Sequence, residues 1–83
     1  MKQWLRTLWE LSKWERSADP SAPELAREMN RFPEALCREL RELRVRGLVK
    51  RIEPNRPDKI GLRNRWRITE KGKNRLRREG INV

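Results

Sequence analysis

The segment LRNRWRI, residues 62–68, has an arginine at every second position, and this alternation is the feature that most limits how the chain can fold. Successive side chains of a strand point to opposite faces, so a period of two predicts a β-strand. Trp66 and Ile68 would face a core, and the arginines would line the other, exposed face. These arginines are Arg63, Arg65 and Arg67. A row of charges on a strand also protects a sheet edge against aggregation, which requires no ligand.

A stiff loop precedes this strand. Residues 54–59 contain two prolines, and the short segment before them includes the β-branched residues Val49 and Ile52. Two strand-like segments joined by such a loop predict a β-hairpin, which we place at residues 48–68.

The first helix is predicted over residues 2–14, where apolar side chains recur at helical spacing. Its apolar stripe spans about 160°, whereas docking on one small core takes a stripe a little over about 100° wide. One explanation is that the tryptophans fill volume in a small core. The other is that Trp9 or Trp14 stays outside the monomer core and forms a two-fold interface between first helices, giving a homodimer.

Residues 21–46 predict a helix-turn-helix. Ser21 and Glu24 have the spacing of a capping box at the start of a short helix that ends near Met29. Pro33 starts the next helix, because proline is tolerated in a first helical turn. Its inward face is predicted to consist of Leu36, Leu40 and Leu43, with Phe32 leading into them.

The last helix is predicted over residues 70–79, with Thr69 as its N-terminal cap and Gly80 at its end. Residues 1–83 then form one domain, mainly α with a small β-hairpin (α+β). The order of elements is helix, helix, helix, strand, strand, helix.

Composition indicates a small soluble intracellular domain, and we expect it in the cytoplasm. A chain of 83 residues buries only about 60–65% of the surface that its unfolded form exposes. Four tryptophans still argue for a packed core, and no apolar run approaches the length of a membrane span. The single cysteine, Cys37, cannot form an internal disulfide. Cys37 is either a small packing residue, which is the commoner role of such a cysteine, or a redox sensor.

Positive charge is concentrated in the C-terminal half. Residues 1–43 contain eight Lys/Arg and eight Asp/Glu, whereas residues 44–83 contain fourteen and four, so the whole net charge of +10 lies in the second half. Such a concentration of positive charge is typical of proteins that bind a polyanion, either nucleic acid or an acidic membrane. Nucleic acid is the better match, because no basic helix with a broad apolar face accompanies the charge.

The sequence gives no support for catalysis. The chain has no histidine or tyrosine, no glycine-rich phosphate loop and no acidic cluster with metal-ligand spacing. We therefore expect neither an enzyme nor a metal or cofactor site.

Three motifs resemble the winged helix-turn-helix domain of MarR-type and related bacterial and archaeal regulators. They are SAPELAREM at 21–29, LRELRVRGLVKR at 40–51 and WRITEKG at 66–72. The sequence departs from that pattern in the wing, where DKIG at 58–61 replaces the usual aspartate-arginine pair. It also lacks the long terminal helices of that family, and no ligand-binding domain follows, so a small-molecule effector is not expected.

The resemblance implies a double-stranded DNA-binding protein, a small transcription regulator, with its third helix in the major groove and its wing on the backbone. Arg38 and Arg41 lie opposite the leucine face and match the O6 and N7 acceptors of guanine. Glu34 either accepts from cytosine or, as we favour, stabilises the helix N-terminus.

Contacts to the DNA backbone are expected from basic residues of the turn, the wing and the last helix. The candidates are Arg31, Arg56, Lys59, Arg63, Arg65, Arg67, Lys71 and Lys73. A second function stays open: a winged helix that docks on protein or RNA in a larger nucleoprotein assembly. The neutral first half favours this alternative, and Arg38 and Arg41 favour DNA.

Overall fold

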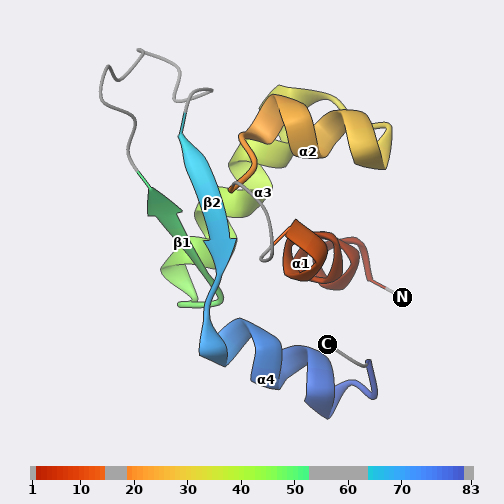
Figure 1. Ribbon diagram of the computed structural model, residues 1–83, viewed down its shortest axis with the longest axis vertical. Helices are drawn as coiled ribbons and strands as arrows, with labels where there is room; N and C mark the ends of the chain where they lie inside the picture. Colours follow the sequence, from red (N-terminus) through yellow and green to blue (C-terminus); the bar gives the residue numbers. More distant parts are fainter. Residues whose placement is uncertain (1, 15–18, 53–63, 82–83) are drawn as a thin grey trace.

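The computed structural model describes residues 2–14, 19–52 and 64–81 (Figure 1). The order is helix, helix, helix, strand, strand, helix, as predicted. The elements are α1 (Gln3–Trp14), α2 (Ala22–Met29), α3 (Pro33–Val45), β1 (Val49–Ile52), β2 (Arg65–Ile68) and α4 (Glu70–Arg78). The fold is therefore a small α+β winged helix, in which α1 packs against α4 and β2, and α2 packs against α3. No helix in these ranges is long and apolar enough to cross a membrane.

The start of α2 is the predicted capping box. Ser21 Oγ accepts a hydrogen bond from the backbone N–H of Glu24, and Glu24 Oε1 accepts one from the backbone N–H of Ser21 at 3.2 Å. These bonds satisfy donors that a helix N-terminus otherwise leaves without partners. The helix ends at Asn30, whose φ of 55° lies in the left-handed region that asparagine tolerates better than most residues.

Strand β2 has neighbours on both edges. On one side it pairs antiparallel with β1, in a register that places Val49 opposite Ile68 and Lys50 opposite Arg67. On the other side the Trp66 N–H donates to the carbonyl of Pro20 at 2.9 Å, and Ser21 forms an isolated bridge with Arg65. The segment that leads into α2 is thus attached to the free edge of β2 by one isolated bridge.

The predicted alternation along β2 is present. Trp66 is fully buried and Ile68 nearly so, while Arg65 and Arg67 are exposed on the other face. Trp66 belongs to a core that every helix supplies with leucine. Those leucines are Leu5, Leu8 and Leu11 of α1, Leu25 of α2, Leu36, Leu40 and Leu43 of α3, and Leu76 of α4.

The prediction that Phe32 leads into the leucine face of α3 is wrong, because its side chain is 80% exposed. Phe32 is the N-cap residue, and its backbone is extended, with φ −73° and ψ 132°. The helical spacing that relates Leu36 to Leu40 therefore does not continue back to Phe32. Pro33 is the reason, since the residue before a proline is driven out of the helical conformation.

The start of helix α4 packs against the turn between α3 and β1 and is hydrogen-bonded to it. Thr69 caps the helix by accepting from the Gly72 N–H at 3.1 Å, as predicted, and its hydroxyl donates to the Gly47 carbonyl at 2.6 Å. Gly72 lies so close to this turn that a Cβ atom there would overlap the Leu48 carbonyl oxygen and approach Ile68 Cγ1 to 2.7 Å. Only glycine allows α4 to pack at this distance.

We predict that Gly72→Ala lowers the free energy of unfolding by about 3 kcal/mol, the upper end of what overpacking costs, because the obstructing atom belongs to the backbone. Urea denaturation measures the change. Gly80→Ala is the matched control, since Gly80 has open space around it but a φ of +79°. This control should cost only about 1–2 kcal/mol. Equal losses in the two variants would contradict the steric explanation.

Candidate nucleic-acid interface

The outward face of α3 carries the three base-contacting candidates. Glu34, Arg38 and Arg41 are exposed, whereas the leucines behind them are buried. Within the described ranges the Arg38 side chain has neither an acidic partner nor a hydrogen bond. Glu34 occupies the first helical turn, where a carboxylate is favoured by the helix dipole. Cys37 belongs to the buried set and is 4% exposed.

The outer face of the hairpin combines residues of both strands. The register places Lys50 beside Arg67, so with Arg65 it forms a cluster of three cations, all exposed. Sequence analysis did not single out Lys50. Its position depends on which residue of β1 lies opposite Arg67, and a register across an uncertain loop cannot be derived from alternation alone.

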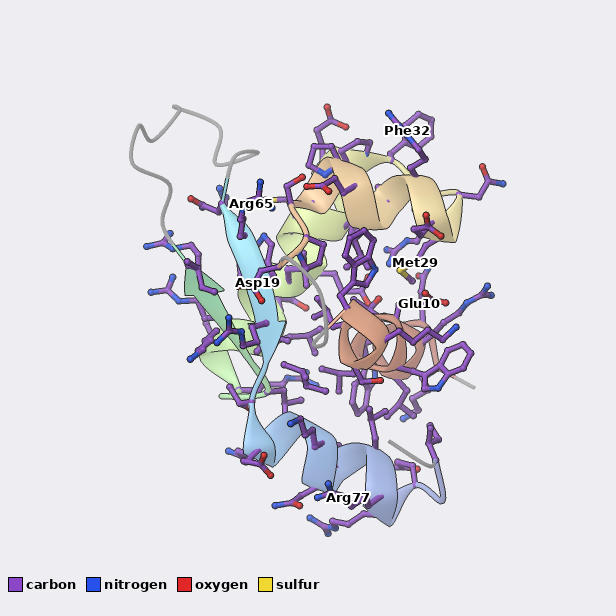
Figure 2. All side chains as sticks on the ribbon, in the orientation of Figure 1. Glu10, Asp19, Met29, Phe32, Arg65 and Arg77 are labelled. Carbon is purple, nitrogen blue, oxygen red and sulfur yellow. The ribbon has the colours of Figure 1, made fainter. Side chains whose placement is uncertain are left out.

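Two arginines of this face also bind the segment before α2. Figure 2 labels Arg65 on β2 and Asp19 in that segment. Arg67 binds the Asp19 carboxylate through two parallel hydrogen bonds, Nε to Oδ1 at 2.9 Å and Nη2 to Oδ2 at 2.8 Å. Arg65 donates to the Asp19 carbonyl and lies 3.6 Å from Glu24 Oε1. The side chains of Arg65 and Arg67 remain 48% and 44% exposed, so both still face solvent. The other wing candidates, Arg56, Lys59 and Arg63, lie outside the described residues.

Arg31 has an internal ion-pair partner. Its guanidinium pairs with Glu39 of α3, and both side chains are only 15% exposed. Arg31 Nη1 also donates to Thr7 Oγ1 at 3.3 Å, and the Thr7 hydroxyl lies 3.1 Å from Glu39 Oε1. This network joins α1, the turn between α2 and α3, and α3, and it fixes the orientation of the candidate recognition helix.

Lys71 and Lys73 lie on α4, at the end of the molecule opposite α2 (Figure 1). Lys73 pairs with Glu70 at 3.3 Å, whereas Lys71 is exposed beside the turn between α3 and β1. The structure therefore does not bring these two lysines together with α2 and the start of α3.

Trp9 and Trp14, the candidates for a dimer interface, are partly buried and pack against the core. Lys13 Nζ lies 3.5 Å from the centre of the Trp9 ring, a distance at which a cation is attracted to the aromatic face. Both tryptophans keep exposed surface on α1.

Phe32 is a surface residue that sequence analysis assigned to the core. It projects from the start of α3 at the same end of the molecule as α2 (Figure 2). The signal that would have placed it is Pro33, which makes Phe32 the N-cap residue. An exposed phenylalanine at this position can make an apolar contact with a partner.

Comparison with solved structures shows the same fold in two proteins. The chain is similar to RV1404 from Mycobacterium tuberculosis, with 22% identity and a TM-score of 0.69 over 89% of this chain and 46% of that one. It is also similar to the MarR family transcription regulator SP03579, with 21% identity and a TM-score of 0.58 over 99% of this chain and 60% of that one. No family model and no curated protein matches. The chain has a winged helix-turn-helix fold and spans about half the length of these structures.

We predict that Glu39→Ala lowers the free energy of unfolding by about 3 kcal/mol, because it leaves the largely buried Arg31 guanidinium without its counter-charge. Thermal or urea unfolding measures the loss. Glu79→Ala removes the acidic partner of Arg75 in a pair whose two side chains are both 39% exposed. That control should cost less than about 1 kcal/mol. Similar costs would show that the Arg31–Glu39 pair does not hold α3.

Proposed function

We propose that this protein binds double-stranded DNA as a small transcription regulator, with α3 in the major groove and the hairpin on the phosphate backbone. The observation that carries the proposal is the outward face of α3, where Arg38 and Arg41 are exposed above a fully packed leucine face. The fold supplies a recognition helix at this place, and the net charge of +10 suits a polyanion.

Each part of the surface has its own role in this proposal. Arg38 and Arg41 read guanine through its O6 and N7 acceptors, and Phe32 offers an apolar contact to a thymine methyl group. Glu34 stabilises the N-terminus of α3 or accepts from cytosine. Phosphates are bound by the wing, through Lys50, Arg56, Lys59, Arg63, Arg65 and Arg67. A protein that acts on DNA in this way works in the cytoplasm, on the nucleoid.

A second function, docking on protein or RNA in a larger assembly, is favoured by two observations. Arg65 and Arg67 already bind Asp19, so part of the wing charge serves the fold itself. Phe32 at 80% exposure and Val45 at 88% give α3 apolar surface at both of its ends. Selection from a random duplex library at near-physiological salt separates the two functions, because only the DNA regulator enriches a sequence.

We predict that α3 and the hairpin differ in what they contribute to DNA binding. Replacing Arg38 or Arg41 with alanine should cost about 1–3 kcal/mol on the selected site and little on random duplexes, because a base contact is lost. Replacing Lys50 and Arg65 should weaken binding to every duplex and reduce the salt dependence by about 0.9 in log–log slope for each phosphate contact. Fluorescence anisotropy across a salt series measures both effects.

Each single substitution removes one positive charge, so the single Arg38 and Arg41 variants and the single Lys50 and Arg65 variants control each other. Unfolding midpoints must be compared as well, because Arg65 also holds the Asp19 segment. The assignment of roles is wrong if the hairpin variants change sequence preference while the α3 variants do not.

We also propose a homodimer formed by α1, in which the exposed parts of Trp9 or Trp14 meet their symmetry mates. Two recognition helices would then read half-sites about one turn of DNA apart, or a multiple of that distance. We predict a dimer in sedimentation at micromolar concentration, and a monomer when Trp9 and Trp14 are both replaced by glutamine. A monomeric native protein that binds single half-sites contradicts this proposal, as does a dimer that the double variant leaves intact.

A further inference from the structure

A hollow of about 540 Å³ lies between α1, α4 and the turn that joins α3 to β1. Its volume falls within the range of about 300–1,000 Å³ that is typical of pockets for small ligands. Trp4 and the buried Leu48 provide apolar wall. The remaining wall is strongly basic, and its cations are Arg46, Lys71, Arg75 and Arg78.

These cations have almost no counter-charge. No acidic residue is found among the described residues that line the hollow. Arg75 pairs with Glu79 at 3.2 Å and lies 5.2 Å from the centre of the Trp4 ring. Over the described ranges, the side chains of Arg46, Lys71 and Arg78 have neither an acidic partner nor a hydrogen bond. Three unpaired cations on one concave surface repel one another unless an anion joins them.

Helix stability does not explain the position of Lys71. Lys71 belongs to the first turn of α4, where the helix dipole disfavours positive charge. Its side chain passes over Gly47, so close that a Cβ atom there would meet Lys71 Nζ at 3.6 Å. The ammonium group thus lies beside the turn that carries Arg46, and cations from two elements converge.

The hollow is separate from the proposed DNA-binding surface. It is built by α4, the N-terminal part of α1 and the end of α3. In Figure 1, α4 lies at the opposite end of the molecule from α2, and Figure 2 shows Phe32 and Arg77 at these two ends. The hollow can therefore bind a ligand whether or not the protein binds DNA.

We propose that this hollow binds a mononucleotide, with the phosphate on the cations and the base against Trp4. A phosphomonoester carries close to two negative charges and several acceptor oxygens, so it suits a cluster of guanidinium and ammonium groups better than one carboxylate does. Guanidinium forks match phosphate oxygens in geometry. Arg75 lies over the Trp4 ring, so a base can stack on its guanidinium plane or on the part of the indole that it leaves uncovered. Sequence analysis argued against a small-molecule effector because it found no separate ligand domain. A hollow shared by three elements has no signature in the sequence.

Calorimetric titration of the full chain with AMP, ribose 5-phosphate and adenosine tests the proposal. We expect AMP to bind, ribose 5-phosphate to bind at least about fivefold more weakly because the stacking contribution is lost, and adenosine to bind more weakly still. The double variant Arg46→Gln with Lys71→Gln should weaken AMP binding by at least about tenfold, since two charge-assisted contacts are removed. Comparing natural ligands on the native protein tests the Trp4 wall without a variant that disturbs the core.

The matched control is Arg6→Gln with Arg27→Gln, which removes the same charge from exposed positions outside both the hollow and the proposed DNA-binding surface. This control should change AMP affinity less than twofold. The proposal is overturned if AMP fails to bind at millimolar concentration, if adenosine binds as tightly as AMP, or if the two double variants have equal effects. A hollow variant that weakens duplex binding while no nucleotide binds would assign these cations to DNA instead.

Discussion

The fold depends on the backbone hydrogen bonds that β2 makes along both of its edges. An isolated two-stranded hairpin is marginally stable in water, so β1 and β2 need further partners. Here the N–H of Trp66 donates to the Pro20 carbonyl, while the same residue inserts a fully buried indole among the helices. The entry to α2 is thereby attached to the hairpin, and the hairpin is attached to the core. Through β2, the two parts of the proposed DNA-binding surface, the helix-turn-helix and the hairpin, are held in a fixed arrangement.

Arg65 and Arg67 show how one row of charges serves two purposes. They hold the Asp19 segment against β2, and each keeps nearly half of its side chain exposed. An arginine that forms two hydrogen bonds to a carboxylate is also restricted in its rotamers, so less entropy is lost when a phosphate approaches it. Such pairing lowers the net charge of the wing but fixes where its remaining charge lies. The side chains of Arg65 and Arg67 are therefore held in more definite positions than the sequence implies.

Positive charge is divided between two places in the molecule. The outward face of α3 and the hairpin carry one share, and the hollow beside α4 carries the other. In the linear sequence the hairpin and α4 belong to the same basic half, residues 44–83, which suggested a single polyanion surface, whereas Arg38 and Arg41 of α3 lie in the neutral half. The structure separates them because β2 enters α4 directly through Thr69, and α4 then runs along the side of α1 away from α2. Net charge thus indicates the sign of a partner, while the chain path decides how many partners it can have.

The sequence by itself determined the element order, the capping residues and the two faces of α3 and β2. Each of these rests on local chemistry: a capping box needs only Ser21 and Glu24, and alternation along β2 needs only the geometry of a strand. Tertiary structure decided which residues lie beside Arg31, Asp19, Lys50 and Lys71, because those neighbours come from other elements of the chain. It also decided that Phe32 is exposed, since a proline interrupted the helical spacing on which its burial was predicted. Periodicity reports which face of an element is apolar, whereas contacts between elements follow from strand register and chain path, which no local pattern encodes.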